Sequence, residues 1–168
     1  LPALNELKIF ADENVWFAYL NEQFSNINAL YPETNIHLNS CHEAPIEPLL
    51  DGRANVYFSF NRLQHAGISC KQINKIKLML ATNTHGIELK TSNAMSFLNV
   101  NWSLDYLKMY EKNIAANFSC NWKTNSVALA LNLLKNGDYC IYFPHILMQD
   151  NTLNIVEGAP DFELDLYV

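Results

Sequence analysis

Positive charge is scarce in this sequence. The 168 residues include 11 Lys and Arg against 17 Asp and Glu, so the formal net charge is −6 at pH 7. A surface that binds nucleic acid needs basic side chains to neutralise the phosphates. We therefore do not expect this chain to bind DNA by itself.

Long apolar runs are missing too. No run approaches the roughly 20 residues that a helix needs to span a bilayer, so no membrane partner is expected. The first residues, LPALNELKIF, lack the basic and then apolar regions of a signal peptide. The cysteines form no CxxC pair, which is typical of thiols in a reducing compartment; they are Cys41, Cys70, Cys120 and Cys140. Together these features favour a cytoplasmic protein.

Motifs of catalysis and metal binding are absent as well. The five histidines show neither HxH nor HExxH spacing, and the chain contains no GxSxG, GxGxxG or P-loop sequence. The run Cys41-His42-Glu43 is the nearest to a reactive cluster, but neighbouring residues on a strand point to opposite faces of the sheet. We expect no catalytic residues, no metal and no cofactor.

Apolar residues, at 49% of the chain, are what the sequence does provide. A chain of this length buries roughly 70% of its unfolded surface. Strands are predicted at 7–11, 35–39 and 54–60, and apolar residues recur at helical spacing from Val15 until Pro32 ends the helix. A short helix at 47–51 ends at Gly52. This alternation predicts an α/β fold with a parallel sheet.

A second α/β unit follows. The pattern predicts a strand at 75–81, helices at 104–112 and 125–136 with Gly137 as the C-cap, and strands at 115–120, 139–143, 152–156 and 162–168. The stretch 92–102 is ambiguous between helix and strand. The last strand has no obvious partner near it in the sequence, so we expect it to cross back to the first unit.

Four stretches that span most of the chain carry a resemblance to a known family. They are LKIFADENVWFAYLNEQFSNINALYP (Leu7–Pro32), LLDGRANVYFSF (Leu49–Phe60), KLMLATNTHGIE (Lys77–Glu88) and SVALALNLLKNGDYCIYFP (Ser126–Pro144). Their content, order and spacing resemble the effector-binding domain of bacterial LysR-type transcriptional regulators. That domain shares its two-lobed fold with type 2 periplasmic binding proteins.

The resemblance implies a type 2 periplasmic-binding-protein-like fold, in which each lobe is a mixed sheet flanked by helices and two strands cross between the lobes. Lobe I would comprise about residues 1–82 plus 161–168, and lobe II about 83–160. It also implies a homodimer, with a tetramer possible in the full-length protein. DNA would be contacted only through an N-terminal winged helix-turn-helix domain that this chain does not contain.

Effector-binding positions follow from the same resemblance. Small-molecule ligands of open α/β sheets bind beyond the carboxyl ends of the strands, at helix N-termini. The residues that match such positions are Asn14, Ser40 and Cys41 in lobe I and Asn101, Ser103, Thr124 and Asn125 in lobe II. Ser40 and Cys41 match the loop after the second strand. A cleft-facing Cys41 could also report oxidation.

Several alternatives stay open at this point. Asn14 and Asn125 could act only as N-caps, each stabilising a helix by about 1 kcal/mol. Asp12 and Glu13 would disfavour an anionic effector if they face the cleft, and would complement the helix dipole if they face away. The whole chain could also be an exported solute-binding protein on the same fold, or a regulator that has lost its ligand response.

Overall fold

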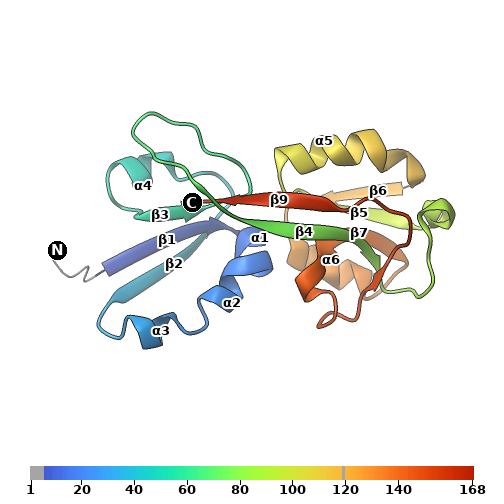
Figure 1. Cartoon of the computed structure of the whole chain (residues 1–168), viewed down its shortest axis with the longest axis horizontal. Helices are drawn as coiled ribbons and strands as arrows, with labels where there is room; N and C mark the ends of the chain where they lie inside the picture. Colours follow the sequence, from blue (N-terminus) through green and yellow to red (C-terminus); the bar gives the residue numbers. More distant parts are fainter. Residues whose placement is uncertain (1–5, 119) are drawn as a thin grey trace. The chain divides into compact units, whose positions relative to one another are not determined.

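The computed structural model describes residues 6–118 and 120–168, which divide into two compact units. The first comprises residues up to Asn74 together with Asp165–Val168, and the second comprises Lys75–Leu164. Residues 75–82, placed in lobe I from the sequence, therefore belong with the second unit. The chain passes between the units within two long strands, β4 (Gln72–Thr82) and β9 (Phe162–Tyr167), which pair with each other (Figure 1).

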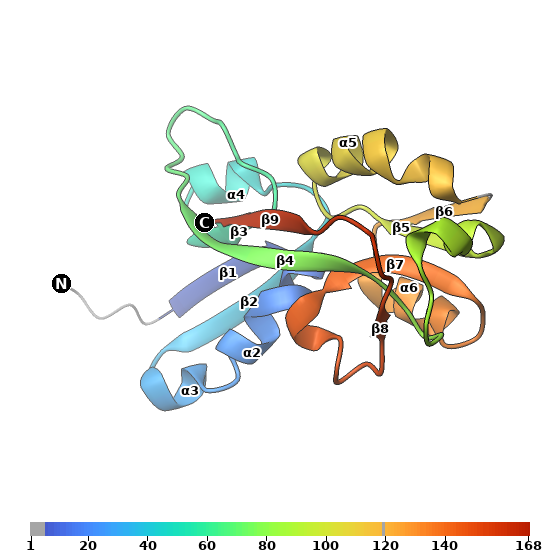
Figure 2. The same cartoon turned by 45° about the vertical axis from the view of Figure 1, so that its right-hand side comes forward.

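The first unit is built on a three-stranded parallel sheet in the order β2-β1-β3. Its strands are β1 (Glu6–Asp12), β2 (Asn35–Cys41) and β3 (Val56–Phe58). An antiparallel bridge from Ser59 to Tyr167 joins the end of β9 to this unit. Figure 2 shows the helical segments after β1 beside β2, and α4 (Ile46–Leu50) beside β3. Gly52 follows α4 with φ +77°, as expected of a glycine that stops a helix.

The helix predicted from Val15 to Pro32 is interrupted. It begins two residues earlier as α1 (Glu13–Val15), continues as a π-helix (Trp16–Leu20) and α2 (Asn21–Gln23), and resumes as α3 (Ile27–Leu30). At the break, the Ser25 hydroxyl donates a hydrogen bond to the Glu22 carbonyl (2.7 Å), a local bond that competes with helix continuation. The Trp16 indole donates to the Asn39 carbonyl (3.1 Å) and so ties this segment to β2.

The second unit contains a six-stranded sheet in the order β6-β5-β7-β4-β8, with β9 paired to β4. Its further strands are β5 (Ser96–Val100), β6 (Cys120–Thr124), β7 (Tyr139–Pro144) and β8 (Asn154–Ile155). The strand predicted at 115–120 is wrong, because Ala115–Asn117 forms a 3₁₀ turn and the strand begins at Cys120. The ambiguous stretch 92–102 divides into a 3₁₀ helix (Leu89–Ala94) and β5.

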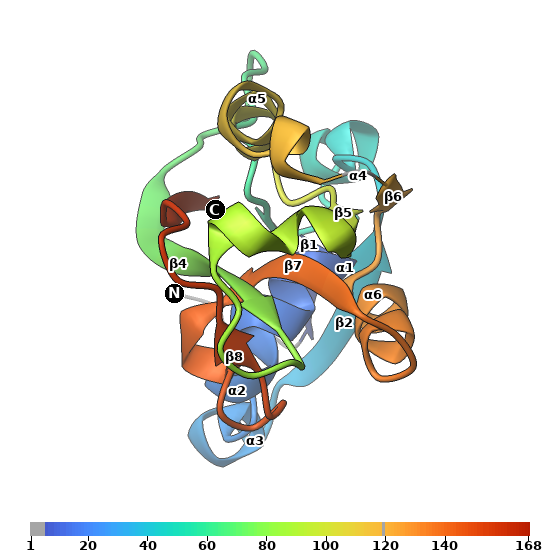
Figure 3. The ribbon, with the colours of Figure 1, turned by 90° about the vertical axis from the view of Figure 1, so that its right-hand side faces the viewer.

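Two helices cover opposite faces of this sheet, α5 (Leu104–Asn113) and α6 (Val127–Leu134) (Figure 3). Aromatic rings dominate the α5 side: Phe97 stacks on Tyr110 with ring centroids 4.6 Å apart, and Tyr106 lies edge-on to Tyr142 at 5.8 Å. Such ring pairs add stability beyond the area that they bury. Among the described residues, no helix is long and apolar enough to cross a membrane.

Three capping predictions are corrected by the structure. The N-cap of the first helix is Asp12 rather than Asn14, and that of α6 is Ser126 rather than Asn125; the Ser126 hydroxyl accepts a bond from the Leu129 amide (3.3 Å). Gly137 is not a left-handed C-cap either, since its φ is not positive. A Cβ at Gly137 would instead lie 2.5 Å from Cε2 of the Tyr139 ring.

We therefore expect Gly137→Ala to destabilise the protein by about 1–3 kcal/mol, because the added methyl group overlaps the Tyr139 ring. Urea unfolding measures this cost. In a Tyr139→Ala background the penalty should vanish, and the lower backbone entropy of the unfolded chain with Ala should make the change neutral or favourable. An equal penalty in both backgrounds would contradict a clash with the ring.

Candidate functional site

Polar side chains gather at the carboxyl ends of β1 and β2 in the first unit. Because the two strands are parallel and Asp12 is in register with Cys41, both strands end at the same edge of the sheet. Ser40 pairs with Ala11 one step earlier. Ser40 and Cys41, expected in a loop, are thus the last residues of β2. The pairing brings Asp12, Ser40 and Cys41 together as neighbours.

Asp12 is the centre of a hydrogen-bond cluster at this edge. Its Oδ1 accepts from the Tyr57 hydroxyl (2.8 Å) and its Oδ2 from the Ser59 hydroxyl (2.9 Å), both at the end of β3. The Ser59 oxygen in turn accepts from the Asn61 amide (3.0 Å). The carboxylate makes no capping bond to the helix that it precedes. The Asp12 carboxylate is therefore held by hydroxyl groups of its own unit and not by the helix N-terminus.

Burial raises the pKa of Asp12 above its ordinary value of 3.8, and the bonds from Tyr57 and Ser59 and the charge of His42 offset part of that rise. A carboxyl group whose pKa is raised on folding is stabilising in its protonated form. Its contribution is complete below the unfolded pKa and declines as the pH rises through the folded pKa.

The Asp12→Asn variant should remove this pH dependence. We expect the stability of the wild type relative to the variant to fall as the pH rises from the ordinary carboxyl pKa of 3.8 through the raised pKa of folded Asp12, because ionised Asp12 is disfavoured by burial. Urea unfolding across that range measures the difference. Asp51→Asn is the control, since Arg53 lowers the pKa of the exposed Asp51 and any change there has the opposite sign. A difference that is constant with pH would contradict the burial effect.

Cys41 lies beside this cluster, and its thiol is 3.6 Å from the Ala11 carbonyl. Burial, followed by the charge of Asp12, raises the pKa of Cys41 to about 11. At that pKa only roughly one part in 10⁴ is thiolate at pH 7, and the thiolate is the form that reacts with oxidants. The electrostatics therefore disfavour the redox role considered for this residue.

Asn14 and Ser40 differ in solvent exposure. Asn14 lies inside α1 and is only 5% exposed, whereas Ser40 is exposed at the end of β2. Neither residue is among those that line the first-unit hollow described next. They remain predicted effector contacts on the strength of their position at the sheet edge.

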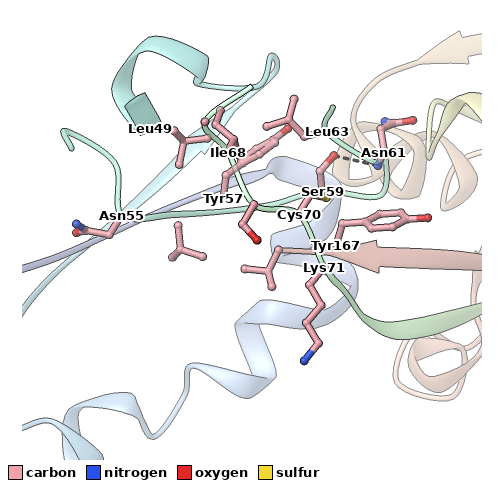
Figure 4. Close-up of a pocket in the computed structure, with 14 residues that line it drawn as sticks. Leu49, Asn55, Tyr57, Ser59, Asn61, Leu63, Ile68, Cys70, Lys71 and Tyr167 are labelled. Carbon is pink, nitrogen blue, oxygen red and sulfur yellow. Dashed lines mark hydrogen bonds between the residues drawn. The ribbon is translucent and has the colours of Figure 1, made fainter. Parts of the chain in front are cut away.

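The first unit does contain a hollow of about 410 Å³, on the other side of β3. Figure 4 shows Leu49, Leu63 and Ile68 beside the Tyr57 ring, with the Lys71 side chain pointing away from them. Tyr57 links this hollow to the Asp12 cluster, because its ring lines the hollow and its hydroxyl bonds Asp12. The sequence reading identified no residue of this hollow as functional.

In the second unit, parallel pairing again gathers predicted residues. Asn101 follows β5 and its amide donates to the carbonyl of Thr124, the last residue of β6 (2.8 Å). The Thr124 hydroxyl accepts from the Ser126 amide (3.1 Å). Asn101, Thr124 and Asn125 line one hollow of about 460 Å³. Ser103 is not part of it; it is 4% exposed and caps α5 by accepting from the Tyr106 amide (3.1 Å).

Four residues missed from the sequence complete the lining of this second-unit hollow. Asn99 on β5 and Lys123 on β6 are register partners, so their side chains leave the sheet on the same face, and Leu107 and Glu111 come from consecutive turns of α5. The i, i+4 spacing of Leu107 and Glu111 was visible in the sequence. Asn99 lies in the apolar run SFLNV, which gave no sign of a functional side chain.

Asn99 is also exceptional in its hydrogen bonding. In the part of the chain that the structure describes, two buried side-chain oxygens lack a partner, Oδ1 of Asn99 and the hydroxyl of Tyr106. An unsatisfied buried polar atom costs about 1–3 kcal/mol and is rare in native proteins. Asn99 is 3% exposed and lines the hollow, so a ligand there can supply the missing donor.

Metal chemistry finds no support in the described residues, since no group of three or more His, Cys, Asp or Glu among them could hold an ion. The polar groups at both sheet edges are amides, hydroxyls and a few charged groups. Such groups beside apolar side chains fix the orientation of small organic ligands.

The fold defines the class of domain that this chain resembles in three dimensions: it folds like the regulatory, effector-binding domain of LysR-type transcriptional regulators, as the sequence resemblance implied. It matches the bromide-bound regulatory domain of HypT from Salmonella typhimurium with a TM-score of 0.72 and 14% identity, over 98% of this chain and 85% of that one. It matches the effector-binding domain of a BenM variant with a TM-score of 0.69 and 19% identity, over 97% and 84%.

A third similar structure is that of CrgA, a LysR-type transcriptional regulator from Neisseria meningitidis. The TM-score is 0.71 at 14% identity, over 96% of this chain, and this chain spans 60% of the length of that one. No family profile and no curated protein sequence matches the chain. At these identities the likeness establishes the fold, and the predicted two-lobed α/β architecture with two crossing strands is confirmed.

Proposed function

We propose that this chain is the ligand-sensing regulatory domain of a bacterial LysR-type transcriptional regulator. The observation that carries the proposal is a shared fold over 96% or more of the chain with the regulatory domains of HypT, the BenM variant and CrgA. Polar residues at the carboxyl edges of both sheets provide the groups that would bind an effector. The domain would act by binding, without catalysis and without a cofactor.

The proposed effector is a small molecule bound between the two units, in contact with Asn14, Ser40 and Cys41 on one side and Asn101, Thr124 and Asn125 on the other. A ligand shifts a conformational equilibrium only by its difference in affinity for the two states. An effector that bridges the units would therefore favour one relative arrangement of them. In a dimer that arrangement would set the spacing of the DNA-binding domains.

A homodimer is the proposed assembly, with a tetramer possible for a full-length protein. Each unit carries large exposed apolar side chains at a sheet edge. In the first unit Leu38 lies on the edge strand β2 and is 52% exposed; in the second, Trp122 on the edge strand β6 is 49% exposed and Leu129 on α6 is 51% exposed. Open edges with exposed apolar residues are typical of protein–protein contacts.

The dimer is tested by size-exclusion chromatography with light scattering. We expect the wild-type chain to be a dimer and Leu129→Glu to weaken dimerisation by about 10-fold or more, because it buries a charge in an apolar contact. Ile146→Glu, at a 60% exposed site in the same unit, is the matched control and should leave the dimer intact. A wild-type chain that stays monomeric at high concentration would count against the regulator.

The regulatory role is tested by reading the native coding sequence upstream of Leu1. The proposal expects a winged helix-turn-helix followed by a long amphipathic helix in the same frame. A secretory signal peptide in that place would instead identify an exported solute-binding protein, and the proposal would fall.

A further inference from the structure

The second-unit hollow is lined by one acid and one base that do not pair with each other. Glu111 projects from α5 and Lys123 from β6, and both side chains are exposed. In the described part of the chain, the ion pairs recorded within 4.0 Å involve neither residue. Opposite charges that face one hollow without joining are complementary to a ligand that carries both signs.

A residue with an unpartnered acceptor lines the same hollow. Asn99 on β5 is the register partner of Lys123 on β6. Only 3% of Asn99 is exposed, and its Oδ1 has no hydrogen-bond partner. The neighbouring residues are already ordered by bonds of their own: the Tyr110 hydroxyl donates to Asn121, and the Asn101 amide donates to Thr124. The unsatisfied oxygen therefore requires an N–H or O–H group from outside the chain.

We infer that this hollow binds a small zwitterion of the α-amino-acid class. The ligand ammonium donates to Asn99 Oδ1 and faces the Glu111 carboxylate, the ligand carboxylate pairs with Lys123, and Leu107 contacts the ligand side chain. Charge-assisted hydrogen bonds of this kind are the strong ones in a partly buried site. A volume of about 460 Å³ accommodates such a ligand together with water. Its role as an effector site rests on the proposed function; the binding itself does not.

The experiment titrates the purified chain with each proteinogenic L-α-amino acid, using thermal denaturation to find binders and calorimetry to measure Kd. Each binder is compared with the amine and the carboxylic acid that carry the same side chain but only one charge. At least one amino acid should raise the melting temperature, and both of its singly charged analogues should bind about 10-fold or more weakly, because each lacks one charged contact.

Three variants locate the binding. Asn99→Leu, Lys123→Met and Glu111→Gln should each raise the Kd of that amino acid by about 10-fold to 100-fold, the range of a hydrogen bond to a charged group. Asn99→Leu should leave the melting temperature of the free chain equal or higher, because it removes the unsatisfied oxygen. Lys123 and Glu111 are exposed, so their variants report on binding even if Asn99→Leu misfolds. Lys90→Met and Glu88→Gln, exposed outside the hollow, are the matched controls and should change nothing.

The inference is overturned if no amino acid shifts the melting temperature, if a singly charged analogue binds as tightly as the amino acid, or if the three variants retain full affinity. These outcomes are distinct from failure of the proposed function. If the chain binds an amino acid and is preceded by a secretory signal, the inferred binding site is supported and the regulatory function is contradicted. A helix-turn-helix upstream with no amino-acid binding would keep the regulator and reject the ligand class.

Discussion

Parallel strand pairing is the constraint on which both candidate sites depend. When two neighbouring strands run the same way, they end at one edge of the sheet, and the residues that follow them are brought together whatever their separation in sequence. Register partners Asp12 and Cys41 share such an edge in the first unit. In the second, β5 pairs with β6, so Asn99 meets Lys123 and Asn101 meets Thr124. Without this pairing none of these side chains would form a site.

The second unit also shows how aromatic packing can surround a buried polar group that lowers the stability of the fold. Phe97 precedes Asn99 by two residues on the same face of β5 and stacks between Tyr110 and Phe118, with ring centroids 4.6 Å and 5.0 Å away. This aromatic packing fixes α5 against β5, the strand that carries the buried Asn99 side chain with its unpartnered oxygen. An apolar residue at this position would remove a penalty of about 1–3 kcal/mol. Retaining a polar group there is a feature of binding sites rather than of cores.

The order of strands and helices could be predicted from the sequence because apolar periodicity reports which face of each element is buried. The last strand was expected to cross back to the first unit. In the structure β9 pairs with β4 in the sheet of the second unit, and only its end, Asp165–Val168, belongs to the first unit, where Tyr167 bridges to Ser59. Helix starts were less predictable. Both Asn14 and Asn125 are favourable N-cap residues, but a nearby residue takes the N-cap position in each case. For the first helix it is Asp12, whose oxygens accept hydrogen bonds from Tyr57 and Ser59. For α6 it is Ser126, whose hydroxyl accepts a hydrogen bond from the Leu129 amide. Tertiary contacts decide which of two nearby residues caps a helix, and these contacts cannot be seen in the local sequence pattern.

The candidate site residues also differ in whether they could be predicted from the sequence. Asn101, Thr124 and Asn125 could be named as candidates from the family resemblance, although the strands beside them, β5 and β6, were left ambiguous or misplaced by the sequence pattern. Asn99 could not, because a buried acceptor inside a strand looks like any residue of an apolar run until its partners are counted. The charge of the effector was equally undecidable from Asp12 and Glu13 alone. In the structure Asp12 accepts hydrogen bonds from two hydroxyl groups of its own unit, and burial raises its pKa. The charges that select a ligand then lie in the second unit, on Glu111 and Lys123, and because they are of opposite sign they favour a ligand with two charges over one with a single charge.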